Sequence, residues 1–283
     1  MKQSLWWIKI KKKEISDNMN KLKFYIEKAF KTFNKPEMRI LPGNIAFFFV
    51  LALVPIVTIV VLIASYFSIS LENIIKFIEN LVPREASKII IEAISGKGFD
   101  GSVGTFNIIA FFVASNGTYS LINAANTLYK VKTRDALKDR IKSFILLFIL
   151  LLLIIFLLLV PMFGEKLLSL LKEGTLVNNL KIIYNILKWP TTIFLIYINL
   201  KLIYTIAPSI RISSKSTTWG SIFTTVIWTI TTAFFGYYLK YFANYDVIYG
   251  NLSNIIILMM WLYIISYVFV MGIAINVTNL EEN

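Results

Sequence analysis

Residues 144–163 read FILLFILLLLIIFLLLVPMF, an unbroken run without a charged or hydrogen-bonding side chain. A helix needs about 20 apolar residues to cross the ~30 Å hydrocarbon core of a bilayer. A run of this length and composition would be out of place on a water-soluble domain. It therefore predicts a helix that spans a membrane.

The composition of the whole chain agrees with that prediction. The sequence is 57% hydrophobic and only 16% charged, with a mean hydropathy of +0.69, whereas soluble domains are about one quarter charged. The net charge is +13. Because the basic residues stand in short runs between apolar segments, their pattern indicates orientation in a membrane. We expect membrane lipids as partners and no nucleic acid.

Five further segments are apolar enough to be spans, although residues 103–124 are interrupted by several polar side chains. The six candidates are 45–67, 103–124, 144–163, 189–206, 219–239 and 255–275. The predicted fold is an all-α integral membrane protein, a bundle of six transmembrane helices. We divide it into a basic cytoplasmic or interfacial N-terminal segment (1–43), a transmembrane domain (44–278) and a short cytoplasmic tail (279–283).

Basic residues are concentrated in alternate connections. The N-terminal segment and the second and fourth connections are rich in Lys and Arg, whereas acidic residues offset the basic ones in the first connection. Because Lys and Arg are retained on the cytoplasmic side, this asymmetry predicts that both termini face the cytoplasm.

Two segments have helical periodicity but are too short or too charged to span. Between Leu22 and Phe33, apolar residues alternate with lysines at helical spacing, which predicts an amphipathic helix on the inner leaflet. It would be an interfacial anchor or a docking site for a partner or an anionic head group. Between Leu71 and Leu81, an apolar stripe predicts a short amphipathic helix on the outer side.

The residues available for chemistry are few. The chain has no Cys and no His, which removes thiol nucleophiles, imidazole bases and nearly all structural zinc sites. No carboxylate lies within a predicted span. Asp135 and Asp139 are four residues apart among basic residues, a pattern typical of a solvated helix face. We therefore expect no catalytic residue, metal site or cofactor, and no enzymatic activity.

Polar residues within the spans have two readings. They either bond neighbouring helices together or line a substrate path. Small and polar side chains recur every four residues along the fifth span, which favours close packing, with a polar groove as the alternative. The candidates are Ser115, Asn116, Asn123, Asn126, Thr225, Thr229 and Asn276.

Both membrane surfaces offer recognition candidates. At the outer surface, an aromatic belt could also serve as a recognition loop; its candidates are Tyr238, Tyr245, Asp246, Tyr249 and Gly250. At the inner surface, four basic residues could contact lipid head groups; they are Arg134, Arg140, Lys201 and Arg211. Lys201 lies near the inner end of the fourth span, so we expect its ammonium group to reach the cytoplasmic surface.

Several motifs resemble those of one family. Phe235-Gly236 is followed by Tyr238, Phe242-Ala243, Tyr245 and Tyr249-Gly250, then by Trp261-Leu262-Tyr263 and by Gly272 and Asn276; earlier come Leu53-Val54-Pro55 and the series Ser115 to Asn126, Tyr129 and Arg140. In order and spacing these residues resemble the YihY/BrkB family of bacterial inner-membrane proteins, once labelled ribonuclease BN. The chain departs from the family pattern at Ala52, where Ser is common, and at Ala274, where Glu is common.

That resemblance implies a six-span protein of the bacterial inner (cytoplasmic) membrane, with relatives linked to serum resistance and to the handling of lipids or envelope precursors. It leads to the hypothesis of a protein that transports or flips a lipid or other amphiphilic envelope precursor. The alternative is a non-transporting scaffold of the envelope, whose protein partners the sequence does not specify. Metal-dependent RNA cleavage needs clustered His, Asp or Glu, so we expect no nuclease activity.

Overall fold

The structure is a computed structural model, which describes residues 36–66, 71–81, 104–132, 135–170, 175–241 and 249–281, with Ser87, Ile91 and Tyr245 as isolated positions. Every regular element in this part of the chain is helical, which confirms the predicted all-α class. The elements are α2 (Pro36–Tyr66), α3 (Leu71–Leu81), α5 (Gly104–Leu128), α6 (Ala136–Leu170), α7 (Thr175–Ile206), α8 (Thr218–Tyr241), the 3₁₀ turn η1 (Gly250–Leu252) and α10 (Ser253–Glu281). The amphipathic helix predicted between Leu22 and Phe33 lies outside the described residues.

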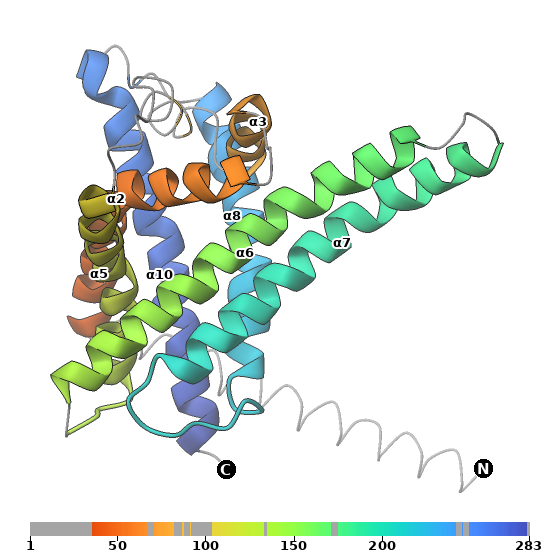
Figure 1. Cartoon of the computed structure of the whole chain (residues 1–283). Coiled ribbons are helices and arrows are strands. Elements are labelled where there is room, and N and C mark those ends of the chain that lie inside the picture. The colour runs from red at the N-terminus through yellow and green to blue at the C-terminus, as the bar shows by residue number, and fades with distance from the viewer. Residues whose placement is uncertain are drawn as a thin grey trace, which may run out of the picture.

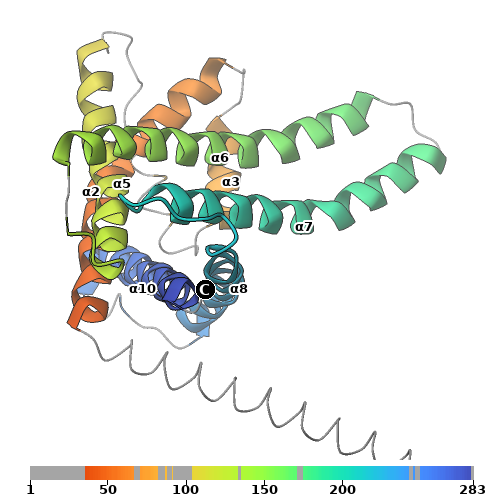
Figure 2. The same cartoon turned by 90° about the horizontal axis from the view of Figure 1, so that it is seen from below.

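The six long helices pack in a closed sequence of neighbours. Helix α2 packs against α5, α5 against α6, α6 against α7, α7 against α8, α8 against α10, and α10 returns to α2 (Figures 1 and 2). In both views α6 and α7 run side by side and extend beyond the other helices. They form a long hairpin whose base is joined to the rest of the bundle.

Helix α2 does not cross as one straight rod. It contains Pro42 and Pro55, and both views show its later part bent away from its first part (Figures 1 and 2). Pro55 lacks an N–H to bond Leu51 and its ring crowds the preceding turn, which bends helices. The helix already begins at Pro36, so part of the segment assigned to the N-terminal region continues into the first span.

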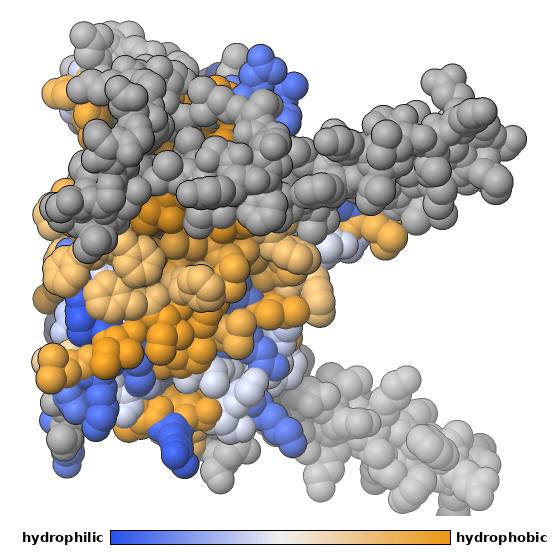
Figure 3. All heavy atoms as spheres, viewed as in Figure 1, coloured by the Kyte–Doolittle hydropathy of each residue, from blue (hydrophilic) through white to orange (hydrophobic). Residues whose placement is uncertain are grey.

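Four helices contain stretches that are long and apolar enough to cross a membrane, within the described residues. These are Pro36–Leu53 in α2, Ile186–Ile206 in α7, Thr218–Tyr241 in α8 and Ser253–Thr278 in α10. The other two predicted spans fall on α5 and α6, so the count of six remains a prediction. On the face seen in Figure 3, the described residues form a broad apolar band above a more hydrophilic lower end. Exposed large side chains such as Phe148 and Phe194 fit contact with lipid rather than water.

The connections predicted to be cytoplasmic gather at one end of the molecule. The end of α5, the start of α6, the end of α7, the start of α8 and the C-terminal end of α10 lie at the lower end of Figure 1. Hydrophilic residues also collect at that end in Figure 3. The structure thus groups these ends as the charge pattern does. That they face the cytoplasm remains a prediction, and we call this end the basic end.

One cluster of buried apolar residues joins α2, α5, α6, α7 and α10, and includes Ile45, Ile122, Leu146, Leu200 and Ile273. In a membrane such a cluster gains little from the hydrophobic effect, because lipid is as apolar as the core. Close packing and hydrogen bonds between helices then stabilise the bundle. The polar contacts described next are therefore central to how these helices are held.

Candidate functional site

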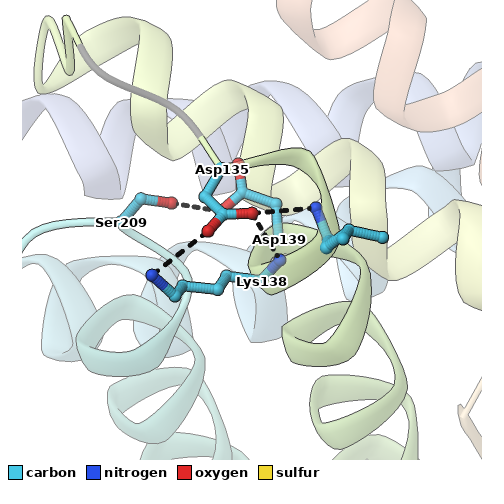
Figure 4. Close-up of polar contacts among 5 residues, drawn as sticks. Asp135, Lys138, Asp139 and Ser209 are labelled. Carbon is cyan, nitrogen blue, oxygen red and sulfur yellow. Dashed lines mark hydrogen bonds and ion pairs between the residues drawn. The ribbon is translucent and has the colours of Figure 1, made fainter.

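A network of hydrogen bonds joins three segments at the basic end. Asn126 comes from the end of α5, Asp139 from the first turns of α6, and Ser209 from the connection between α7 and α8. The Asn126 side-chain amide donates to an Asp139 carboxylate oxygen at 3.2 Å and to Ser209 Oγ at 2.9 Å. Ser209 in return donates its backbone N–H to Asn126 Oδ1 at 2.7 Å. The hydroxyl of Ser209 donates to Asp139 (Figure 4). We call these three residues the Asp139 network.

The turn between α5 and α6 places Asp139 in this network. Helix α5 ends in a Schellman motif: Lys130 N–H bonds Thr127 O, Val131 N–H bonds Asn126 O, and Lys130 adopts a left-handed φ of 52°. Asp135 then precedes the first residue of α6 as its N-cap, and its Oδ1 accepts the N–H groups of residues 137 and 138 at 3.2 Å. The two caps fix the register in which the first turn of α6 meets α5.

The prediction that Asp135 and Asp139 share a solvated face is wrong for Asp139. Its exposed fraction is 2%, whereas the side chain of Asp135 is 48% exposed and forms an ion pair with Lys138 at 3.1 Å. The four-residue spacing was read correctly, but α5 and the α7–α8 connection cover the second of the two positions. A lone helix sequence carries no signal for that cover. The polar residues Asn126 and Ser209, far apart in sequence, were the available hint.

Lys142 holds the same connection from the other side. Its Nζ donates to the carbonyl oxygen of Pro208 at 2.8 Å. Partial burial lowers the pKa of Lys142, and the nearby negative charge of Asp139 opposes that shift. The residues 208 and 209 are thus clamped by side chains from both α5 and α6.

Arg140 is the next residue along α6, and it points elsewhere. Its Nη1 donates to Asn116 Oδ1 at 2.8 Å and its Nη2 to the carbonyl oxygen of Phe112 at 3.1 Å. The guanidinium carbon lies 4.0 Å from the centre of the Phe112 ring and 5.0 Å from that of Phe144. We call Arg140 with Asn116 and Phe112 the Arg140 cradle. Desolvation lowers the pKa of Arg140.

The polar residues predicted in the second span are therefore not one patch. Asn126 belongs to the Asp139 network and Asn116 to the Arg140 cradle. Ser115 is buried and donates to the Phe112 carbonyl of its own helix at 2.7 Å, and Asn123 is half-buried, with its backbone oxygen bonded by Thr127. Thr118, another polar residue of this span, donates to Ser143 O on α6 at 2.6 Å.

The threonine hydroxyls of the small polar stripe on α8 form hydrogen bonds within their own helix. Thr225 donates to Ser221 O at 2.8 Å and Thr229 to Thr225 O at 2.9 Å, both within the helix. Bonding across helices comes from Thr224 instead: its hydroxyl lies 2.7 Å from the Tyr204 hydroxyl, which donates to Phe269 O at 2.9 Å. The sequence therefore showed the stripe, but the residue that links α8 to α7 is Thr224, next to Thr225 of the stripe.

Asn276 links α10 to the start of α8. Its Oδ1 accepts the N–H of Gly220 at 2.9 Å, and its Nδ2 is buried without a partner among the described residues. A Cβ on Gly220 would lie 2.2 Å from the Gly272 carbonyl oxygen, and a Cβ on Gly272 would lie 2.1 Å from Thr224 Oγ1. Only glycine at both positions permits α8 and α10 to approach this closely. Gly220 and Gly272 therefore mark a close crossing of the two helices.

The predicted outer recognition residues are only partly described. The hydroxyls of Tyr238 and Tyr245 lie 3.3 Å apart, and the Tyr245 ring stacks near Tyr249 with centres 6.2 Å apart. The hydrogen bond to Tyr238 is the main cause that raises the pKa of Tyr245 to about 12. Gly250 has the left-handed φ of 52° that the turn into α10 requires. Asp246 lies outside the described residues.

Of the other predicted head-group contacts, the structure describes Lys201 and Arg211. Lys201 Nζ lies 3.4 Å from Tyr197 Oη, one turn towards the start of α7 and therefore away from the basic end. This direction differs from the expected reach to the surface, because side chains on a helix lean towards its N-terminus. Arg211 is exposed at the basic end, and Arg134 lies outside the described residues.

Comparison with known sequences identifies the family. The profile of the family described as Virulence factor BrkB matches residues 29–283. The chain belongs to this family. The resemblance carried by Leu53-Val54-Pro55 and by the aromatic residues before α10 is thereby confirmed.

Relatives within the BrkB family differ in how much of the chain they match. The ribonuclease-like protein YfkH of Bacillus subtilis is 27% identical over 258 residues, covering 89% of this chain and 94% of that protein. A UPF0761 membrane protein of Chromobacterium violaceum is 32% identical over 114 residues, covering 39% of this chain and 27% of the relative. A UPF0761 membrane protein of Coxiella burnetii is 29% identical over 112 residues, covering 36% and 40%. No solved structure matches the chain.

These relatives support a bacterial membrane protein of the BrkB family. The ribonuclease-like name belongs to the Bacillus protein. Among the residues that the structure describes, no group of three or more His, Cys, Asp or Glu could hold a metal ion.

Proposed function

We propose that this BrkB-family protein transports an amphiphile, such as a lipid or envelope precursor, between the two leaflets of the bacterial inner membrane. The observation that carries the proposal is the Asp139 network, a carboxylate enclosed where the α6–α7 hairpin joins α5. A buried charge is a weak source of stability, since apolar residues of similar volume often stabilise a fold as well or better. Ionisable groups enclosed in membrane proteins are therefore functional candidates.

The position of the network supports a role in movement. Asp139 lies near the start of α6, and Ser209 lies just after the end of α7, so both belong to the base of the hairpin. The bonds to Asn126 fasten this base to α5. Rearrangement of these few bonds would change how the hairpin is held relative to the other helices (Figure 1).

A translocation assay tests the proposal directly. Purified protein is placed in vesicles containing a lipid with a fluorescent head group, and the appearance of that lipid in the outer leaflet is followed by chemical quenching. We expect faster exchange than in protein-free vesicles, and a loss of about tenfold in the Asp139→Asn variant. The matched control is Asp135→Asn, the same substitution at an exposed position one turn earlier, which should exchange lipid at the wild-type rate.

One result would contradict transport: wild-type exchange no faster than in protein-free vesicles, for both anionic and zwitterionic lipids. Equal, fast exchange by wild type and a correctly folded Asp139→Asn variant would instead remove the Asp139 network from the mechanism.

A second candidate is a scaffold that packs against other envelope proteins without transporting lipid. It is favoured by the polar residues whose bonds are complete within the bundle, such as Thr225 and Thr229 on α8. A scaffold predicts that Asp139→Asn lowers thermal stability and recovery of a cross-linked partner, while lipid exchange equals that of empty vesicles.

The proposed orientation has its own test, since the chain contains no cysteine. Lys132 is exposed at the basic end, and Glu72 is exposed on α3. In intact cells, a cysteine at position 72 should react with an impermeant maleimide, and one at position 132 should react only after the membrane is opened. The reverse pattern would place the basic end outside.

A further inference from the structure

We propose that the Arg140 cradle is a binding site for the phosphate of an anionic lipid head group, on the lipid-facing surface formed by α5 and α6. This inference rests on the proposed function in one respect: it identifies the head-group class of the transported amphiphile. The binding step itself does not require transport.

Arg140 has no acidic partner among the described residues: no carboxylate there forms an ion pair with it. The groups that hydrogen-bond its guanidinium are the neutral amide of Asn116 and the backbone carbonyl of Phe112, and the ring of Tyr119 lies 5.9 Å from it. Its neighbour Asp139 is turned into the protein and engaged by Asn126 and Ser209. A guanidinium held in a poorly hydrated place gains most from an anion that the protein itself does not supply.

The guanidinium of Arg140 is held in place and keeps hydrogen-bond donors that no described residue uses. An arginine has five N–H donors in a planar fork. One hydrogen each on Nη1 and Nη2 is used by Asn116 and Phe112, and Nε is buried without a partner. One N–H on each terminal nitrogen therefore remains for a ligand. Two donors from one planar group suit the oxygens of a phosphate better than a single point charge does.

The Arg140 cradle lies on an apolar part of the surface. The Arg140 side chain is half-buried, the Phe112 ring beneath its guanidinium is exposed, and the next residue along α6, Ile141, is exposed as well. Asn116 and Phe112 lie well inside α5, so the guanidinium extends along that helix rather than out into the basic end. A ligand that reaches it must tolerate apolar surroundings beside its charge. A lipid, with acyl chains attached to its phosphate, meets both conditions.

The experiment measures which lipids remain on the full-length protein. Wild type is incubated in mixed vesicles of phosphatidylcholine and phosphatidylglycerol, extracted in an uncharged detergent, and its bound lipids are measured by mass spectrometry. We expect phosphatidylglycerol to be enriched over its share in the vesicles, and Arg140→Gln to reduce that enrichment about tenfold. The control is Lys138→Gln, which removes the same charge from an exposed position on the same helix turn and should leave the enrichment unchanged.

A second variant guards against a folding defect. Asn116→Leu keeps the charge of Arg140 but removes the oxygen that holds its Nη1, so selectivity should fall while thermal stability stays close to wild type. Equal losses in Lys138→Gln and Arg140→Gln would show general surface attraction and would overturn the site. Enrichment unchanged in Arg140→Gln would do the same.

Two further measurements distinguish lipid phosphate from free phosphate, and head-group binding from transport. Excess inorganic phosphate that displaces the bound lipid through Arg140 would overturn the lipid as the preferred occupant and indicate a free anion. Selective binding that depends on Arg140, together with lipid exchange no faster than in empty vesicles, would support the site and overturn transport. Fast exchange of phosphatidylglycerol and phosphatidylcholine alike, unaffected by Arg140→Gln, would leave transport standing and overturn the site.

Discussion

Asp139 and Arg140 are adjacent in sequence, yet they lie in opposite kinds of surroundings because successive residues on a helix are about 100° apart around its axis. Asp139 is enclosed, and partners from two other segments bond both of its oxygens. Arg140 is half-buried, and neutral groups hold it with two donors to spare. The comparison separates charge that fastens helices together from charge that is available to a ligand.

The largest expected effect comes from removing the enclosed charge. Asp139→Ala should lower the free energy of unfolding by about 3 kcal/mol, because the hydroxyl of Ser209 and the amide of Asn126 both lose a buried, charged acceptor. Arg140→Ala should cost less than about 1 kcal/mol, since its loss leaves one amide oxygen and one carbonyl that already accepts a bond from Ser115. Thermal unfolding in detergent measures both. Equal losses would erase the distinction between the two residues.

The second effect uses one substitution at two positions of α5. Asn126→Leu should cost about 2 kcal/mol, because the backbone N–H of Ser209 and the carboxylate of Asp139 lose their partner. Asn116→Leu should cost well under half of that, since Arg140 keeps its bond to Phe112 and its ring contacts. A larger loss for Asn116→Leu would mean that the Arg140 cradle fastens the helices as well.

The third effect asks whether bonding between helices matters more than polarity. Thr224→Val should cost about 1 kcal/mol because it breaks the bond that joins α8 to Tyr204 on α7. Thr225→Val should cost a few tenths of a kcal/mol or less, since its hydroxyl bonds only its own helix. Valine has nearly the shape of threonine, so thermal unfolding of the two variants isolates the hydroxyl.

Sequence reasoning reached the fold class because apolar run length and basic flanks depend on local composition. The apolar runs in α6 and α7 needed no knowledge of neighbours, although α7 begins at Thr175, well before the predicted span 189–206, and carries Pro190 inside it. The bend of α2 was harder to predict. The sequence shows Pro55, but how far the later part of the helix turns depends on what it packs against. The family assignment succeeded because it used the order of many weak motifs rather than any one of them.

The candidate site was predictable in its residues but not in its grouping. Asn116, Asn126 and Arg140 were all named, yet nothing local shows that Asn116 meets Arg140 while Asn126 meets Ser209, 83 residues away in the chain. The enclosure of Asp139 was missed for the same reason. Cover by a distant segment decides whether a polar residue on a helix is solvated, and periodicity carries no information on that cover.

The smallest expected effect concerns Asp135, the exposed N-cap of α6 that lies four residues before the enclosed Asp139. Bonds from the backbone N–H and the side chain of Lys138 are the main causes that lower the pKa of Asp135. A carboxyl group whose pKa is lower in the folded state stabilises the fold above its unfolded pKa of about 3.9, and that stabilisation disappears as the pH falls through the folded pKa. Asn caps a helix about as well as Asp, so Asp135→Asn removes the charge and keeps the cap.

Wild type should therefore be slightly more stable than Asp135→Asn at neutral pH, and the difference in thermal stability should disappear as the pH falls below the unfolded pKa of about 3.9 and through the lowered folded pKa of Asp135. Wild type and the Asp135→Asn variant share every other carboxyl group. The difference between their thermal stabilities at each pH therefore reports the charge of Asp135. A difference that persists undiminished in acid would mean that the shape of the cap, not its charge, stabilises the start of α6. In that case the register of Asp139 and Arg140 would depend on Asp135 through geometry alone.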